Sequence, residues 1–246
     1  STTSSVATPT ITVGTLQTGD TLNFSQTYDT KNVGTNKTLT PSGTVTDGNG
    51  GNNYTVTLTP VSTGEITHAT LTATITVSNK VVDGNTSATI LTRSLVGVLG
   101  ADVVTPNADG VATFANASVG NGKAVTASVI TLTGADKDNY SFAGTATGTG
   151  NILPVPEVVY VNGSWTGQVW TDPDSTGPAT FFGYDAFATI QEAVDAVDVG
   201  GTVNVTSGTY NVTATPGITI NKSLTISGAG ASSTVVSGSA KDASVA

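Results

Sequence analysis

Cysteine and methionine are absent from this 246-residue chain, and histidine and arginine occur once each, at His68 and Arg93. Without cysteine the chain forms no disulfide, offers no thiolate to a metal ion and has no thiol nucleophile. A catalytic triad or a histidine-based metal centre would have to depend on His68 alone. Because His68 falls at the junction of the two repeats described below, it is more typical of a boundary or surface residue than of a catalytic one.

Basic residues are also scarce. The chain has 8 Lys and Arg against 17 Asp and Glu, a net charge of −9 and a pI near 4.2. Proteins that bind DNA or RNA use clustered Lys and Arg to displace counterions from phosphates. The composition therefore excludes nucleic acid as a partner, and it excludes electrostatic adhesion to an anionic membrane. Because no run of about 18 apolar residues occurs, we expect no membrane insertion within this chain.

Threonine and glycine are the abundant residues, with 48 and 29 copies in the 246-residue chain. Threonine is β-branched and suits a half-buried pleated surface, whereas glycine, asparagine and aspartate supply turns. Strong helix formers are few outside one stretch near the carboxyl end. The composition predicts an all-β protein.

An internal repeat with an offset of 86 residues runs through the first part of the chain. Residues 28–67 align with residues 114–153 without a gap, and 12 of the 40 aligned positions are identical. The identities include Val33/Val119, Gly34/Gly120, Lys37/Lys123, Asn53/Asn139, Tyr54/Tyr140 and Ile66/Ile152. Such a match indicates a duplicated module.

The repeated segments have the pattern of half-buried strands. Apolar residues alternate with threonine at 54–59 and 71–77, and turns rich in Asp, Asn and Gly lie at 47–52, 83–85 and 134–139. Strands at this spacing predict small β-sandwiches of the immunoglobulin-like type. We therefore expect a first sandwich module at 1–67, which is shorter at its amino end because it is truncated or borrows a strand, and a second at 68–153.

The pattern changes in the remaining segment, 154–246. Pro154 and Pro156 indicate a linker, because proline stiffens the chain and removes a backbone donor. The spacing of apolar residues predicts one helix over Ala186–Val197, with Asp185 as its N-cap. Short strands separated by turns are predicted around it and after it, at 158–161, 202–205, 217–220, 223–226 and 234–236.

Three stretches of the repeats carry a family resemblance: VSNKVVDGNT from Val77, ATFANASVGNGK from Ala112 and LTGADKDNY from Leu132. They resemble a family of repeats, named for a Tyr-Asp-Gly (YDG) motif, found in large bacterial surface proteins and filamentous adhesins. Val82 stands where the motif has tyrosine, while the Asp83–Gly84 turn is kept.

The carboxyl segment has its own resemblance, carried by ATIQEAVDAV from Ala188, GTVNV from Gly201, SGTYN from Ser207 and INKSLTISGAG from Ile220. These residues are similar to the amino-terminal entry of a right-handed parallel β-helix of the pectate-lyase-like type. The resemblance implies that the helix caps the first coil with Phe187, Ile190, Val194 and Val197 buried. It also implies that two or three coils fit before Ala246, and that further chain or another subunit covers the last one.

Alternation within the predicted short strands indicates which side chains point into that solenoid. The residues expected inside are Val203, Val205, Ile218, Ile220, Leu224 and Ile226. Those expected outside are Asn204, Thr219 and Thr225.

Two groups of polar residues are candidate sites. Asp172 and Asp174 offer carboxylates in a turn, which suits calcium, although Asp is equally common in turns for geometric reasons. Asp172, Asp174, Glu192, Asp195 and Asp198 are the carboxylates that could cleave a glycosidic bond. In β-helix lyases the catalytic groups line later coils and a basic residue usually takes part, whereas the only basic residues after Arg93 are Lys123, Lys137, Lys222 and Lys241. We therefore expect no enzymatic activity, no catalytic residue and no cofactor in this chain.

Aromatic residues gather between 165 and 184: Trp165, Trp170, Phe181, Phe182 and Tyr184. Such a group either stacks on a sugar or covers the end of a core beneath a long loop, and we favour the cover.

These patterns together favour a structural, adhesive segment of a large secreted protein on the bacterial cell surface. The expected partners are further copies of the chain or other surface proteins, and carbohydrate is an additional candidate. Two alternatives remain open. One is a carbohydrate-active β-helix enzyme whose catalytic coils lie outside this chain. The other is a surface-layer or extracellular filament subunit in which edge strands pair between chains.

Overall fold

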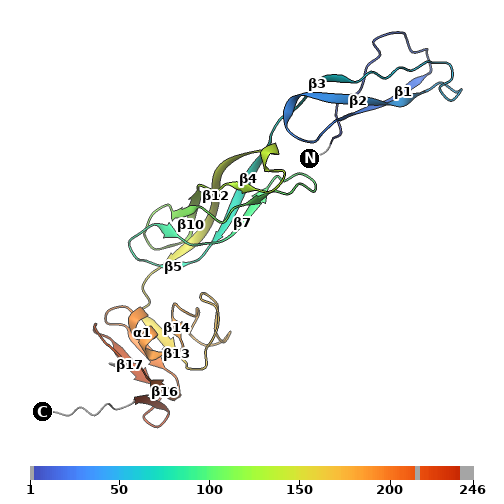
Figure 1. Ribbon diagram of the computed structural model, residues 1–246. Helices are drawn as coiled ribbons and strands as arrows, with labels where there is room; N and C mark the ends of the chain where they lie inside the picture. Colours follow the sequence, from blue (N-terminus) through green and yellow to red (C-terminus); the bar gives the residue numbers. More distant parts are fainter. Residues whose placement is uncertain (1–2, 214–216, 239–246) are drawn as a thin grey trace. The chain divides into compact units, whose positions relative to one another are not determined.

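A computed structural model of the chain describes residues 3–213 and 217–238 (Figure 1). Nearly all regular structure in these residues is β-strand, with one short α-helix and one 3-10 helix, Lys137–Asn139. The predicted all-β class is confirmed. No helix of the described residues is long and apolar enough to cross a membrane.

The described chain divides into two compact units. The first unit holds the chain up to Val77 together with Ser87–Thr113 and Ala124–Thr149. The second holds Ser78–Thr86, Phe114–Lys123 and the chain from Gly150 onward. The two sequence repeats are called below the first module, 1–67, and the second module, 68–153.

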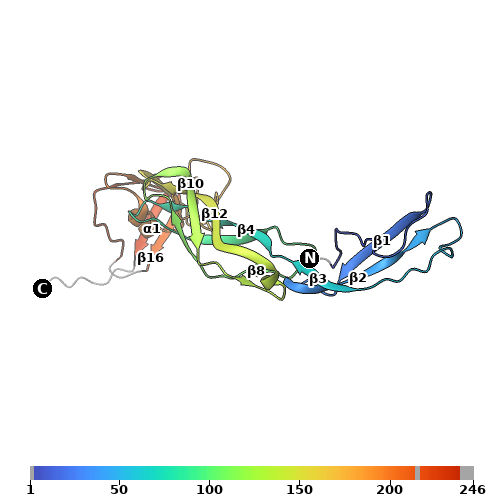
Figure 2. The same ribbon diagram turned by 90° about the horizontal axis from the view of Figure 1, so that it is seen from above.

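The first module contains a three-stranded antiparallel sheet in the order β1-β2-β3 (Figures 1 and 2). Its strands are β1 Thr21–Tyr28, β2 Gly34–Thr46 and β3 Val61–Ile66. The connection between β1 and β2, residues 29–33, is short. Among the described strands β3 pairs only with β2, so β3 forms an edge of this sheet.

The second module has a larger sheet, in the order β6-β9-β10-β12-β4-β7, with β5 beside β12 (Figure 1). Its strands are β4 Ala69–Val77, β5 Lys80–Val81, β6 Ser87–Ala88, β7 Ile90–Val96, β9 Val111–Phe114, β10 Gly120–Ser128 and β12 Tyr140–Leu153. A separate pair joins β8 Thr105–Pro106 to β11 Leu132–Thr133. In the middle of the sheet, β12 runs parallel to β4.

Strand β4 has the alternation that the sequence predicts. Leu71, Ala73, Ile75 and Val77 are buried, and the threonines between them are exposed. One face of β4 therefore contributes to the core while the other meets solvent.

The strand predicted at 54–59 does not form, although the aligned residues of the second module begin β12. The alternation there is correct for a strand, but backbone pairing needs a neighbour. In the second module that neighbour is β4, and no described segment of the first module pairs with 54–59. This sequence prediction is wrong because it depended on a partner strand that alternation cannot reveal.

The carboxyl segment forms two parallel sheets. One has the order β14-β13-β15-β17, and the other pairs β16 with β18. The strands are β13 Val158–Val161, β14 Ala186–Phe187, β15 Thr202–Val205, β16 Gly208–Val212, β17 Thr225–Gly228 and β18 Thr234–Gly238. The predicted strand at 217–220 is irregular chain in the structure.

The helix of this segment is shorter than predicted. Helix α1 spans Ile190–Ala196, and its N-cap is Thr189 rather than Asp185. The Thr189 hydroxyl accepts a hydrogen bond from the Glu192 N–H at 3.3 Å and donates one to the Glu192 carboxylate at 2.8 Å. A threonine followed three residues later by glutamate is a capping motif, and it outcompetes the aspartate four residues upstream.

Asp185 has a different role. Its buried carboxylate accepts hydrogen bonds from the backbone N–H groups of Thr180 and Phe181, at 2.7–3.1 Å. The residues after it form β14 instead of a first helical turn. Despite the shorter helix, the four side chains expected beneath it are buried: Phe187, Ile190, Val194 and Val197.

The residues expected inside the solenoid divide into two groups. Val203 and Val205 are buried, and Ile218 and Leu224 pack against the same core. Ile220 and Ile226, in contrast, are 51% and 41% exposed. Ile226 lies on β17, the last strand of its sheet in the described chain, so no further described strand covers it. For these two residues the expected burial is wrong.

Candidate interface between the two modules

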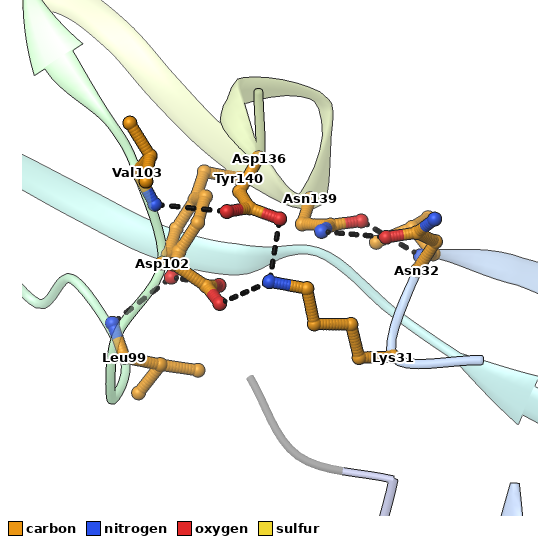
Figure 3. Close-up of polar contacts among 9 residues, drawn as sticks. Lys31, Asn32, Leu99, Asp102, Val103, Asp136, Asn139 and Tyr140 are labelled. Carbon is orange, nitrogen blue, oxygen red and sulfur yellow. Dashed lines mark hydrogen bonds and ion pairs between the residues drawn. The ribbon is translucent and has the colours of Figure 1, made fainter. Parts of the chain in front are cut away.

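Tyr140 stands at the start of β12, and its side chain is buried. Its hydroxyl accepts a hydrogen bond from the Leu99 N–H at 2.9 Å and donates one to Asp102 Oδ2 at 2.7 Å (Figure 3). Leu99 and Asp102 are the two ends of one turn, which is closed by the Asp102 N–H and the Leu99 carbonyl at 3.1 Å. Tyr140 therefore ties this turn to β12 and fixes the position of the Asp102 carboxylate.

A second carboxylate, that of Asp136, is held beside this turn. The Val103 N–H donates to Asp136 Oδ2 at 2.8 Å, and the Asp136 N–H donates to the Val103 carbonyl at 3.2 Å. The close approach requires glycine two residues earlier. Gly134 has φ +108°, and a Cβ there would lie 2.2 Å from the Val103 oxygen. The backbone thus presents the Asp102 and Asp136 carboxylates together.

Lys31 of the first module lies between these two carboxylates (Figure 3). Its Nζ is 2.7 Å from Asp102 Oδ1 and 2.6 Å from Asp136 Oδ1. The side chains of Lys31, Asp102 and Asp136 are 35%, 1% and 13% exposed. An almost fully buried carboxylate is costly unless it is paired and hydrogen-bonded, and here the first module supplies the cation.

The residues after Lys31 also bind the second module. The Val33 N–H donates to Asn139 Oδ1 at 2.9 Å, and Asn139 Nδ2 donates to Asn32 Oδ1 at 3.1 Å. Asn139 is buried, so these bonds satisfy an amide that would otherwise be left without partners. Lys31–Val33 with Asp102, Asp136 and Asn139 form what we call the clasp.

The charges in the clasp support each other. The pKa of Lys31 is raised above its ordinary value, first by the hydrogen bond to Asp102 and then by that to Asp136. The pKa of Asp136 is lowered, first by the hydrogen bond from Lys31 and then by that from Val103. Both shifts favour the charged pair.

The tyrosine–aspartate arrangement occurs in the first module as well. The Tyr54 hydroxyl accepts from the Gln17 N–H at 2.9 Å and donates to Asp20 Oδ2 at 2.5 Å. The Asp20 N–H closes the turn to the Gln17 carbonyl at 3.2 Å, as Asp102 does to Leu99. Each module therefore has the same local motif, a tyrosine hydroxyl inserted into a four-residue turn that ends in aspartate.

The part of the clasp contributed by the first module is not repeated. At the position of Lys31 the second module has Ala117, and at the position of Asn32 it has Ser118. The part contributed by the second module, which accepts these contacts, has more counterparts in the first module. Asn53 aligns with Asn139, and the tyrosine–aspartate motif is present in both modules.

The YDG domain family matches the chain twice, over residues 1–63 and residues 67–148. The chain belongs to the YDG domain family. The clasp therefore joins two consecutive YDG modules, and the family match spans more than half of the sequence. Among curated proteins and solved structures, none matches the chain.

The candidate calcium ligands lie outside the YDG modules, in an exposed turn. Asp172 Oδ1 accepts from the N–H groups of Asp174 and Ser175 at 3.1 and 2.8 Å, and Asp174 Oδ1 accepts from the Thr176 N–H at 3.1 Å. Within the described residues, no three His, Asp or Glu side chains are grouped so that they could hold a metal ion. Calcium at Asp172 and Asp174 stays a prediction.

The other carboxylates considered for glycosidic cleavage have local partners. Glu192 bonds to the helix cap, Asp195 Oδ1 accepts from Gln191 Nε2 at 2.8 Å, and Asp198 Oδ1 accepts from the Val199 N–H at 2.7 Å. His68 is exposed in the connection between β3 and β4. The structure does not bring any of these residues into the clasp.

The aromatic residues divide between core and surface. Trp165 is buried in a cluster with Ala179 and Ala186, against which Phe182 packs. Trp170 is half-buried and stacks on Tyr184 at a centroid distance of 5.8 Å. Trp165 thus belongs to a cluster separate from the core beneath α1, and its role as a cover for that core stays a prediction.

Sequence reasoning missed the clasp. It did identify Asn139 and Tyr140 as repeated residues, which was the available signal. Nothing in the sequence connected Lys31 to Asp102, which lies 71 residues away. A lysine present in one repeat and replaced by alanine in the other was the sign that could have marked a contact specific to one junction.

Proposed function

We propose that this chain is a structural, adhesive segment of a large secreted protein on the bacterial cell surface, in which tandem YDG modules hold a further β-domain. The observation that supports this most is the clasp. Consecutive modules are joined by directed polar contacts from Lys31, Asn32 and Val33 to buried groups of the next module. Contacts of this kind suit a protein whose task is to keep modules in order.

We also propose immunoglobulin-like sandwiches for the modules and a right-handed parallel β-helix for the carboxyl segment. The β-helix is supported by strands that return in parallel register, Thr202 beside Thr225 and Gly208 beside Thr234. It is further supported by the inward alternation of Val159, Val161, Val203 and Val205. Stacked parallel strands with a shared apolar interior are the defining feature of a solenoid.

Mechanical unfolding of single molecules tests the structural role. If the modules work as a coupled array, the chain held at residues 3 and 238 should unfold at a higher force than a Lys31→Met variant. A Lys37→Met variant, whose lysine bonds only within its own module, is the matched control. Equal unfolding forces for all three proteins would contradict a role for the clasp in joining modules.

Antibodies test the location, and product assays test the absence of catalysis. Antibodies against the chain should label intact cells of the encoding organism without permeabilisation, and label confined to permeabilised cells would contradict the proposal.

Incubation with pectin or alginate should release neither reducing ends nor unsaturated products. Turnover that is lost in Asp172→Asn or Asp174→Asn would replace the structural proposal with an enzymatic one.

A further inference from the structure

The connection between β13 and β14, residues 162–185, is a long segment without regular helix or strand (Figure 1). Loops of this kind that exceed roughly 12–15 residues are uncommon in compact domains, and those held in one conformation are usually functional. This loop contains both tryptophans of the chain, together with three aspartates and no lysine or arginine. Its composition suits a ligand that combines apolar surface with polar groups.

Internal hydrogen bonds hold the loop in place. The Trp170 N–H donates to the Phe182 carbonyl at 2.9 Å, and the Phe182 N–H donates to the Thr171 carbonyl at 2.8 Å. The buried Asp185 carboxylate accepts a hydrogen bond from the Thr180 hydroxyl at 2.7 Å, in addition to the backbone bonds described above. The chain around residue 170 is therefore fixed beside the chain around residue 182.

Three aromatic rings come together on this loop. Trp170 stacks on Tyr184 with the ring centroids 5.8 Å apart, and it meets Phe181 edge-on at 6.3 Å. All three side chains are half-buried, so part of their surface is open to solvent, whereas Trp165 belongs to a buried cluster. Among the described clusters of buried residues, none contains these three. We call Trp170, Phe181 and Tyr184 the aromatic platform.

The backbone at Trp170 is unfavourable for a bulky residue. Its φ is +72°, and Ser175 in the same loop has a φ of +58°. These are two of the four residues other than glycine that have positive φ in the described chain. Such strain is typical of ligand-binding sites, where the surrounding structure holds it in place. Because glycine would avoid the strain, a tryptophan at this position indicates that its ring is used.

Polar groups lie next to the platform in the sequence. Gln168 and Asp172 stand two residues before and two residues after Trp170, and both are exposed. Asp172 uses its Oδ1 atom to bind the N–H groups of Asp174 and Ser175, and no group of the described chain donates to its Oδ2 atom. The carboxylate can therefore accept a hydrogen bond from a hydroxyl group, whereas it would repel an acidic ligand.

We propose that the aromatic platform binds a neutral saccharide, with the C–H face of a sugar ring stacked on Trp170 and its hydroxyl groups bonded to Gln168 and Asp172. The three aspartates of the loop and the net charge of −9 disfavour an acidic glycan. A purely apolar ligand would leave the polar groups beside the rings without a partner. The platform shares no residue with the clasp, so this proposal and the proposed joining of modules can fail separately.

Calorimetric titration of the whole chain tests the platform. The neutral probes are cellohexaose, mannohexaose and N-acetylchitohexaose, and hexagalacturonate is the acidic control. We expect saturable binding of at least one neutral probe and no saturable binding of the control. Because Trp165 is buried, quenching of tryptophan fluorescence by acrylamide reports mainly on Trp170, and the bound sugar should reduce it.

Two variants with matched effects on the backbone locate the site. Trp170→Gly removes the ring and suits the positive φ, so the loop should keep its conformation while binding weakens by about tenfold or more. Ser175→Gly relieves the same kind of strain without removing a ring, and should leave binding unchanged. Trp165 is the one tryptophan left in the first variant, so its emission reports whether the buried cluster has kept its fold.

The opposite outcomes overturn the proposal. Absence of saturable binding by every neutral probe removes the saccharide site, and so does equal binding by Trp170→Gly. Tighter binding of hexagalacturonate than of the neutral probes would mean that the loop recognises an acidic glycan instead. If the Trp165 emission shifts in Trp170→Gly, the acrylamide experiment on the wild type decides, and quenching that bound sugar does not reduce would contradict stacking on Trp170.

Discussion

The two YDG modules share a local motif and differ in how completely they bury their cores. Tyr54 and Tyr140 each insert a hydroxyl into a turn that ends in aspartate. Yet Tyr140 is buried and Tyr54 is only half-buried, and the aligned chain after them is a strand in one module and irregular in the other. A turn with its tyrosine forms from nearby groups, whereas a strand requires a neighbouring strand.

The largest expected effect comes from the aligned isoleucines. Ile152 is fully buried on β12, whereas Ile66 at the end of β3 is half-buried. Ile152→Ala should lower the free energy of unfolding by roughly 2–5 kcal/mol, and Ile66→Ala by less than about 2 kcal/mol. Chemical denaturation of both variants measures the difference. Equal losses would mean that the first module has a core as complete as that of the second.

The aligned tyrosines should differ in the same direction. Tyr140→Phe removes the hydroxyl that bonds the nearly buried Asp102 carboxylate, and should cost about 1.5–3 kcal/mol. Tyr54→Phe should give a smaller fall in melting temperature, because Tyr54 and Asp20 remain open to water. Thermal melts followed by circular dichroism compare them. A larger effect at Tyr54 would contradict the conclusion that the second module buries its core more completely than the first.

The clasp should give an effect that depends on which lysine is changed. Lys31→Met removes the cation between Asp102 and Asp136, so the melting temperature of the second module should fall. Lys123→Met changes a half-buried lysine of the second module that bonds only within that module to neutral side chains, and should have a smaller effect. Amide exchange resolved by module and repeated at increasing temperature measures the melting of the second module. Identical melting temperatures for the two variants would mean that the clasp adds no coupling.

The dependence on pH should be the smallest effect, and its sign follows from the pKa shifts. The folded-state pKa of Asp136 lies below 3.8, so its pairing stabilises the fold above pH 3.8 and is lost as pH falls through the lowered value. The folded-state pKa of Lys31 lies above 10.5, so its contribution is present below pH 10.5 and is lost as pH rises through the raised value.

The difference in stability between the wild type and Lys31→Met should therefore be constant between about pH 5 and 9 and shrink outside that range. Denaturation of both proteins across pH measures it. A difference that persists unchanged in acid would show that the methionine acts through packing rather than charge.

Alternation and repetition predicted much of the fold. The pattern in Leu71–Val77 identified β4 and its buried face, and the 86-residue offset identified the duplicated module. The residues buried beneath α1 followed from helical spacing, although the helix begins at Ile190 because the Thr189 cap dominates. The alternation of a strand and the spacing of a helix depend on residues that are close in sequence, so both can be recognised in the sequence itself.

Contacts between distant residues could not be predicted. The pairing of Lys31 with Asp102 depends on where a short loop of one module meets a turn of the next, and neither residue type is unusual. The failure of 54–59 to form a strand has the same origin, because its side chains fit a strand while no described segment pairs with its backbone. For the candidate site, the sequence supplied the tyrosines and the asparagine but not the charges around them.

The nearly buried carboxylate of Asp102 makes stability a property of neighbouring modules rather than of one. Its cation comes from the preceding module, so the free energy of the second module includes a nearest-neighbour term, as in linear arrays of repeats. Such a term depends on order: Lys31 can satisfy Asp102 only when the module that contains it comes first. Exchanging the two modules would place Ala117 opposite the acceptor groups of the first module and would separate Asp102 from Lys31.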